Sequence, residues 1–153
     1  MKYLIIENVR SAYNVGAMFR TADGAGVDKI FLVGYTPAPI DRFGRVQSEI
    51  YKTSLGASET IEWEAVATAA DLIPDLQAQG CVVAAVEQSA QSISIKNFEV
   101  PDHVAYVMGS EVSGVDAVTL GLVDQVVDIP MLGVKESLNV SVAAGIIMYH
   151  GLV

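Results

Sequence analysis

The sequence predicts an α/β fold in which a mostly parallel sheet is covered by helices on both faces. Apolar runs of strand length alternate with segments of helical spacing along the whole 153-residue chain. These runs are apolar throughout instead of at every second position, which is typical of strands buried on both faces. The length is that of about one domain. We therefore expect residues 1–153 to form a single domain.

The elements follow in order from the N-terminus. Residues 3–6 predict a short buried strand. Asn14 is the predicted N-cap of a helix over residues 15–25, and Gly26 ends that helix. The next apolar run, residues 29–33, predicts a second strand. The first strand-to-helix junction thus comes within the first 15 residues.

A long connection over residues 34–60 interrupts the pattern with two prolines and two glycines, and such connections are more often functional than idle. Residues 61–63 predict a small strand. Residues 65–79 have helical spacing, although Pro74 requires this helix to begin late or to kink. The remaining expected elements are strands at 81–86, 104–108 and 123–129, a short helix at 116–122 and a closing helix at 137–150.

Ligands of such sheets bind beyond the carboxyl ends of the strands. In this chain the segments there are residues 7–14, 34–60, 87–95, 109–115 and 130–137. No Gly-x-Ser-x-Gly elbow and no P-loop occur in them. One Cys and two His exclude a disulfide framework and a tetrahedral zinc site, so we expect no metal. No run of 18 apolar residues predicts a membrane span, and we expect a cytoplasmic protein.

Charge is unevenly distributed. The net charge of −9 argues against generic affinity for nucleic acids. However, residues 1–52 carry seven basic and five acidic side chains, whereas only two basic side chains follow residue 52. Such asymmetry indicates either a side that faces nucleic acid or an acidic surface with scattered cations. Charge alone favours neither interpretation.

Three loop segments stand out: NVRSAYNVGAMFRTAD (8–23), MGSEVSGV (108–115) and IPMLGVKESLNVSVAA (129–144). Arg20 follows Asn14 by nearly two helical turns, so both face one cleft only if Asn14 lies at the mouth of the helix. Gly109 directly after a strand permits close approach of a ligand to the backbone. Ser137 is a good N-cap for the last helix. Each segment alone also has a purely structural interpretation as a cap, a turn or a surface cation.

Together, in this order and spacing, the three segments resemble the signature motifs of the SpoU (TrmH-like) RNA 2′-O-ribose methyltransferases of the SPOUT superfamily. The resemblance covers almost the whole chain. Its most specific feature is the Ser-Leu-Asn triplet at residues 137–139, which separates the ribose-methylating branch from base-methylating relatives. Where the family more often has a basic or other polar residue, this chain has Val112-Ser113, a departure that bears on the RNA side.

The resemblance implies S-adenosylmethionine as cofactor, methyl transfer to a ribose 2′-hydroxyl, a C-terminal deep trefoil knot and a homodimer. Nothing in the hydrophobic pattern shows a knot, and true knots are essentially absent from proteins. By the same resemblance the catalytic residues are Arg20, Asn14, Glu111, Ser137 and Asn139, and the cofactor-binding residues are Val86, Gly109, Ile129, Met131 and Leu138. Asn8 matches a further family position near the site.

Arginine is a difficult general base, because a guanidinium stays protonated in proteins. Orientation of the hydroxyl and stabilisation of developing negative charge are physically easier for Arg20. The sequence leaves both roles open.

The expected partners are RNA and a second copy of the chain. Arg10, Arg42, Arg45 and Lys52 lie in N-terminal loops and are candidates for contact with the RNA backbone, or serve solubility alone. By analogy we expect transfer RNA before ribosomal RNA. The charge of −9 leaves open a small local RNA shape or help from an accessory protein subunit.

The last helix resembles an interface, because small and large apolar residues share one broad face (Val140, Ala143, Ala144, Ile147, Met148); packing on the sheet is the alternative. Two other functions stay open: a catalytically inactive relative that binds RNA or protein, and a Rossmann-like nucleotide-binding enzyme. Cofactor preference discriminates the second.

Overall fold

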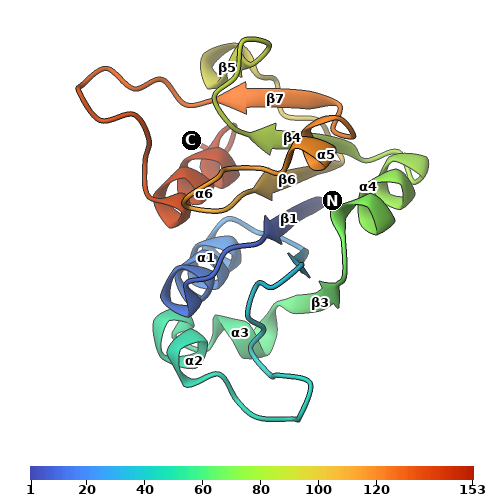
Figure 1. Cartoon of the computed structure of the whole chain (residues 1–153), viewed down its shortest axis with the longest axis vertical. Coiled ribbons are helices and arrows are strands. Elements are labelled where there is room, and N and C mark those ends of the chain that lie inside the picture. The colour runs from blue at the N-terminus through green and yellow to red at the C-terminus, as the bar shows by residue number, and fades with distance from the viewer.

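The computed structural model describes all residues 1–153 and contains one seven-stranded, entirely parallel sheet. Its strand order is β3-β2-β1-β6-β4-β7-β5 (Figure 1). The expected α/β class with a mostly parallel sheet is confirmed. The strands are β1 (Lys2–Glu7), β2 (Lys29–Val33), β3 (Glu62–Val66), β4 (Val82–Val86), β5 (Ile93–Ser94), β6 (Val104–Met108) and β7 (Gln125–Asp128).

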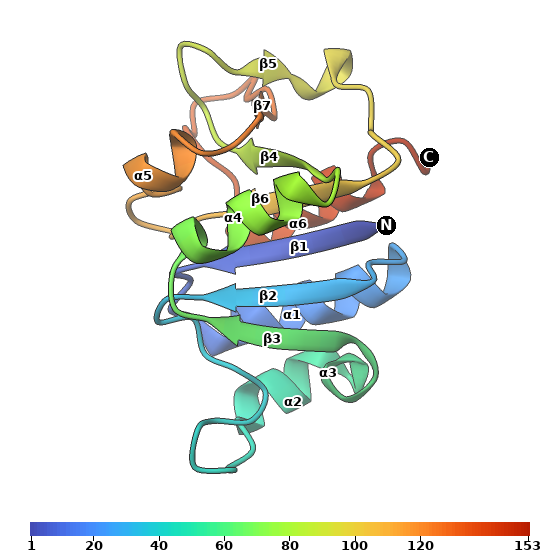
Figure 2. The same cartoon turned by 90° about the vertical axis from the view of Figure 1, so that its right-hand side faces the viewer.

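Helices cover both faces of this sheet. In Figure 2, α4 lies in front of the strands, whereas α1 and α6 lie behind them. The helices are α1 (Ala12–Gly24), α2 (Ser48–Ser54), α3 (Ala57–Thr60), α4 (Ala69–Ala78), α5 (Ala117–Leu120) and α6 (Val140–Tyr149), with a 3₁₀ turn at Ile95–Asn97. None of the helices combines the length and apolar character that a membrane crossing requires.

Each face of the sheet has its own hydrophobic core, because successive strand side chains point to opposite faces. Leu4 and Ile6 of β1 pack with residues of α1, α2 and α6. Ile5 between them packs with residues of α4 on the other face. All five residues of the central strand β6 are buried. The apolar runs of the sequence thus form strands that are covered on both faces.

Three helix starts differ from the expectation. Ser11, not Asn14, is the N-cap of α1, and its hydroxyl accepts a hydrogen bond from the Asn14 N–H at 3.1 Å. Asn139, not Ser137, is the N-cap of α6. The helix expected over 65–79 begins late, at Ala69, because β3 extends to Val66. In each case two residues with capping ability lie within four positions, and packing selects one.

The long connection over residues 34–60 contains the helices α2 and α3, which the sequence pattern did not predict. Gly16 of α1 makes the contact with α2 possible. A Cβ atom at this position would lie 1.7 Å from Thr53 Oγ1 and 2.9 Å from the Ile50 carbonyl oxygen. Gly16 therefore provides packing space, as one of the two interpretations of its motif held.

The apolar face of α6 that we expected at a dimer interface is buried inside the chain. Ala144, Ile147 and Met148 have no exposed surface and Val140 is 8% exposed, while Ala143 packs against the same core. That interpretation of these five residues is wrong, and packing on the sheet is the observed role. The apolar side chains that α6 leaves exposed are Val142 and Ile146.

Candidate active site

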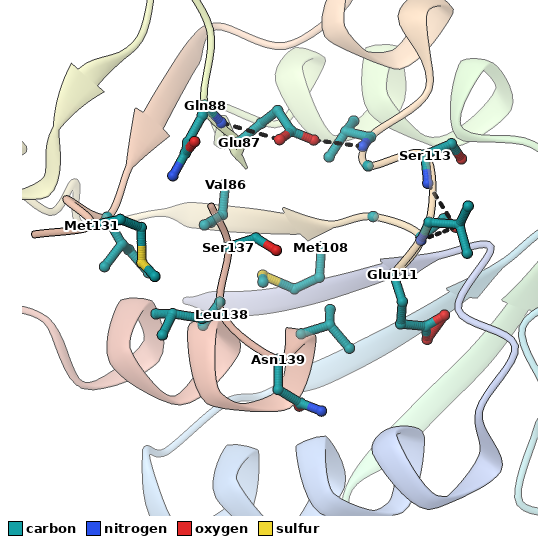
Figure 3. A pocket seen from close by; sticks show the side chains of 18 of the residues that line it. Val86, Glu87, Gln88, Met108, Glu111, Ser113, Met131, Ser137, Leu138 and Asn139 are labelled. Atoms are coloured by element: carbon teal, nitrogen blue, oxygen red, sulfur yellow. Dashed lines mark hydrogen bonds between the residues drawn. The ribbon is translucent and has the colours of Figure 1, made fainter. Parts of the chain in front are cut away.

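The largest cavity of the molecule, about 720 Å³, opens at the carboxyl edge of the sheet. Its walls are the loops that follow β4, β6 and β7 together with the first residues of α6 (Figure 3). Met131 and Glu111 lie at opposite ends of it, and Met108 lies between them. Apolar and polar side chains contribute in similar numbers, which suits a ligand with both a planar apolar part and polar groups.

The loop after β6, residues 109–115, forms a closed turn. Ser110 and Gly114 exchange backbone hydrogen bonds of 3.0 and 2.9 Å, and the Ser110 hydroxyl accepts from the N–H groups of Val112 and Ser113. A Cβ atom on Gly109 would lie 2.4 Å from backbone atoms of Gly114 and Val115. Because those atoms belong to the backbone, only glycine fits at this position.

Glu87, the first residue after β4, holds this turn from the side. Its Oε2 accepts a hydrogen bond of 2.9 Å from the Val115 N–H, and its Oε1 accepts one of 3.1 Å from the Gln88 N–H. Gly114 has a φ of +73°, and a Cβ atom there would lie 2.1 Å from Glu87 Oε2. The carboxylate and the turn therefore fit closely against each other.

Glu7, the last residue of β1, holds the next segment in the same way. Its side chain is 4% exposed. Oε1 accepts from the Asp116 N–H at 3.1 Å, and Oε2 accepts from the Thr119 hydroxyl. A buried carboxylate is costly unless it is hydrogen-bonded, so these two donors are needed. Two carboxylates from distant strands thus receive the consecutive N–H groups of residues 115 and 116.

Sequence reasoning missed both carboxylates. The available signal was a single acidic residue directly after each of two apolar runs, YLII and VVAAV. A charge at that place is either exposed or bound to the adjacent loop, and only the folded chain distinguishes these alternatives.

The start of α6 forms the opposite wall. Asn139 Oδ1 accepts hydrogen bonds from the N–H and the hydroxyl of Ser141, at 2.9 and 2.6 Å. The preceding residues 130–138 make no hydrogen bond with the rest of the chain. Ser137 lies between Val86 and Met108 in the close view of the cavity (Figure 3). The Ser-Leu-Asn triplet therefore lines the cavity directly.

Eight of the ten residues expected in the catalytic and cofactor-binding sets line this single cavity. The five expected cofactor-binding residues all do so, and so do three of the expected catalytic residues. These residues are Val86, Gly109, Ile129, Met131, Leu138, Glu111, Ser137 and Asn139.

Asn14 and Arg20 do not line the cavity. Asn14 is 8% exposed within the first turn of α1. Arg20 lies on the same helix with its side chain in solvent and makes no salt bridge or hydrogen bond. Because α1 packs against α6, both residues belong to the helix pair whose second member borders the cavity.

The four expected RNA-binding residues are exposed and lie outside the cavity. Three of them stack on exposed aromatic rings that sequence reasoning did not single out. The Arg10 guanidinium lies 5.4 Å from the centre of the Tyr35 ring, and those of Arg42 and Arg45 lie 4.9 and 5.0 Å from that of Phe43. Lys52 is in α2.

The turn around Phe43 is held by Asp41, which accepts hydrogen bonds from the Phe43 N–H and the Arg45 N–H. These contacts, above all the one from the Arg45 backbone, lower the pKa of Asp41. Elsewhere, burial raises the pKa of Tyr106, in β6, to about 12. The structure brings together no group of three or more His, Cys, Asp or Glu side chains that could hold a metal ion.

Comparison with known proteins agrees with this geometry. The profile of the SpoU rRNA Methylase family matches residues 1–149. The chain is 33% identical over 145 residues to the 23S rRNA (guanosine-2′-O-)-methyltransferase RlmB of Neisseria meningitidis, an alignment that covers 95% of this chain and 55% of the relative. The chain thus spans about half the length of the curated relatives it matches.

Two solved structures share the fold. An AdoMet-bound rRNA methyltransferase from Sinorhizobium meliloti superposes with a TM-score of 0.87 at 29% identity, over 97% of this chain and 54% of the other. A TrmH/SpoU tRNA modifying enzyme from A. aeolicus superposes with a TM-score of 0.85 at 25% identity, over 97% of this chain and 72% of the other.

Proposed function

The chain belongs to the SpoU methylase family, and we propose that it transfers a methyl group from S-adenosylmethionine to a ribose 2′-hydroxyl of RNA. The observation that carries this proposal is the cavity at the carboxyl edge of the sheet. It gathers all five residues expected at the cofactor and three expected at the reacting centre, from segments up to 53 positions apart in the chain. The relatives of the family named above act in that way on RNA.

The cavity fits the proposed cofactor. Its volume of about 720 Å³ lies within the range of roughly 300–1,000 Å³ that ligand pockets occupy. Val86, Met131 and Leu138 offer apolar surface for the adenine, and the bare backbone at Gly109 permits close approach. When bound, S-adenosylmethionine supplies a methyl group on a sulfonium, which is already a good leaving group. The protein's task is then alignment and activation of the hydroxyl.

Arg20 is the residue that we assign to the hydroxyl. Its guanidinium stays protonated, so it orients the hydroxyl or an adjacent phosphate and stabilises developing negative charge instead of removing a proton. Its side chain is free of partners within the chain. Because it does not line the cavity, the RNA has to extend from α1 to the cavity. Glu111, Ser137 and Asn139 would meet the ribose from the cavity side.

Arg20→Ala should abolish methyl transfer and leave S-adenosylmethionine binding within about two-fold of the unchanged protein, because Arg20 lies outside the cavity. Transfer is measured with radiolabelled methyl donor and binding by calorimetry. Lys96→Ala, which removes an exposed cation of the 3₁₀ turn, is the matched control and should keep both. Equal loss of binding and transfer in Arg20→Ala would contradict the role proposed for Arg20.

The substrate class within RNA is the finer part of the proposal. Sequence alone led us to transfer RNA. The RlmB relatives, at 32–34% identity, are named for 23S ribosomal RNA, and the A. aeolicus enzyme is described as tRNA modifying. Ribosomal RNA is therefore the first substrate to test, with transfer RNA as the second. Mapping of 2′-O-methyl sites in both, with and without the protein, distinguishes them.

The test of the function itself is calorimetric titration with S-adenosylmethionine, with a nicotinamide dinucleotide as control. Saturable binding of the methyl donor alone supports the proposal. Preference for the dinucleotide would contradict it. Binding of the methyl donor without transfer to either RNA class would identify an inactive relative that only binds RNA or protein. Membership of the SpoU family replaces the Rossmann-like alternative.

The basic residues of the N-terminal loops should contribute to RNA affinity through phosphate contacts. Each of Arg10→Ala, Arg42→Ala, Arg45→Ala and Lys52→Ala should lower the salt slope of RNA binding by about one. The slope is measured by filter binding of ribosomal RNA fragments at several salt concentrations. An unchanged slope in all four variants would reject the contact.

Three further parts of the proposal concern assembly and location. We expect a homodimer, although not through the α6 residues first expected, since these are buried in the core. We also expect the C-terminal segment to form a trefoil knot, which the meeting of the loops after β4, β6 and β7 at one cavity supports. A cytoplasmic location and an accessory protein subunit stay expectations. Sedimentation of a stable monomer at micromolar concentration would reject the dimer.

A further inference from the structure

A second, smaller cavity of about 270 Å³ adjoins the large one, and the two share the loop of residues 110–115 as a wall. Its other walls are α5 with its N-cap Asp116, and the residues Asn8 and Tyr35 that follow β1 and β2. None of the residues placed at the cofactor or the reacting centre, apart from the shared loop, takes part in it. The smaller cavity therefore has no role in the function proposed so far.

The wall with Tyr35 is held rigidly. Asn8 has a φ of +53°, a left-handed conformation that is costly for a residue with a side chain and is found mainly at functional sites. Its Oδ1 accepts a hydrogen bond of 3.2 Å from the Tyr35 N–H. A Cβ atom on Gly34 would lie 1.9 Å from that oxygen, so glycine is required there. The buried Thr36 hydroxyl accepts from the Val9 N–H at 3.2 Å.

The facing wall is equally fixed. Glu87 accepts from the Val115 N–H, and Glu7 accepts from the Asp116 N–H and the Thr119 hydroxyl. Glu7 directly precedes Asn8, so the end of β1 supports both sides of the smaller cavity. The shape of this cavity thus exists before any ligand binds.

The side chains that face the smaller cavity favour a planar, uncharged ring. Tyr35 is 55% exposed although its backbone is fixed, and the Arg10 guanidinium lies 5.4 Å from its ring centre. An aromatic ring with an adjacent arginine is the arrangement on which single-stranded RNA bases stack. Asp116 carries an exposed carboxylate without a hydrogen-bond partner, which repels phosphate and accepts hydrogen bonds from base edges.

We propose that the smaller cavity binds a nucleobase of the RNA substrate, stacked on Tyr35, while the ribose of a neighbouring nucleotide enters the large cavity across the shared loop. This inference rests on the proposed function, because it assumes that RNA is the substrate. It identifies Tyr35 and Asn8 as substrate-positioning residues that no motif of the chain contains in that role. It also explains why Arg10 stacks on Tyr35 instead of extending into solvent.

The test uses NMR titration of the full chain saturated with S-adenosylmethionine, so that the large cavity is occupied. The probes are guanosine monophosphate and ribose 5-phosphate, which differ in the base. We expect guanosine monophosphate alone to shift the amide signals of Asn8, Tyr35 and Ser113. Tyr35→Leu should weaken this binding about 10-fold, whereas Tyr35→Phe should retain it.

Two further variants guard the result. Tyr13→Leu removes an equally exposed tyrosine outside both cavities and should bind the nucleotide like the unchanged protein. Ala117→Phe places a ring in the smaller cavity from its α5 wall and should block nucleotide binding even if Tyr35→Leu folds poorly.

Three outcomes would overturn the inference: equal shifts with ribose 5-phosphate, unchanged affinity in Tyr35→Leu, or unchanged affinity in Ala117→Phe. Failure of the proposed function is visible separately, as the absence of any shift around the large cavity when S-adenosylmethionine is added alone.

Discussion

The two loops on opposite sides of the large cavity differ in how the chain holds them. Residues 109–116 are closed by reciprocal backbone hydrogen bonds and fixed by the carboxylates of Glu7 and Glu87. Residues 130–138 make no hydrogen bond within the chain, and Leu132 and Val134 are 97% and 95% exposed. One wall of the cavity is therefore preformed, whereas the other has few contacts that oppose its movement.

This difference has a physical consequence for binding. A preformed wall costs no ordering entropy when a ligand arrives, whereas each residue that becomes ordered costs about 1–2 kcal/mol. The preformed loop should therefore supply affinity and geometry. The unanchored loop should be free to open for ligand entry and to close over the bound ligand.

The largest expected effect comes from a methyl group on the preformed loop. Gly109→Ala places a Cβ atom 2.4 Å from backbone atoms of Gly114 and Val115, which the turn cannot avoid. We expect S-adenosylmethionine affinity to fall about 100-fold, by calorimetry, which corresponds to about 3 kcal/mol of overpacking. Gly133→Ala in the unanchored loop is the matched control, because no atom lies within 4 Å of its Cβ position. Similar losses in both variants would remove the distinction between the loops.

A smaller effect should follow from neutralising one anchor. Glu87→Gln keeps the size of the side chain but loses a charge-assisted acceptor for the Val115 N–H. We expect S-adenosylmethionine affinity to fall about 10-fold, because hydrogen bonds to charged groups contribute about 1.5–3 kcal/mol. Glu136→Gln, an exposed carboxylate of the unanchored loop, should bind normally. Normal affinity in Glu87→Gln would show that the turn holds its shape without this anchor.

The smallest expected effect is a change in exchange rates. The amide hydrogens of residues 131–138 should exchange rapidly in the free protein and several-fold more slowly with S-adenosylmethionine bound. Those of Ser110 and Gly114 are already hydrogen-bonded and should change little. Hydrogen exchange followed by mass spectrometry measures both segments in one experiment. Equal protection of the two loops in the free protein would contradict the comparison.

The sequence by itself determined the strands, the fold class and the cavity lining to a large extent. Continuous apolar runs require burial on both faces, and this requirement is local enough to be read from YLII or VAYVM. The Ser-Leu-Asn triplet and Gly109 likewise line one cavity because the carboxyl ends of parallel strands share one edge of a sheet.

Only the tertiary structure decided which of two nearby residues caps a helix and which face of α6 is covered. Ser11 and Asn14 both have capping side chains, and the choice depends on how α1 packs on β1. An apolar helix face looks the same whether a sheet or a second chain covers it. The anchors Glu7 and Glu87 lie 109 and 28 residues from the N–H groups they bind, so no local pattern relates them. Pairing over such separations arises only when the chain has folded.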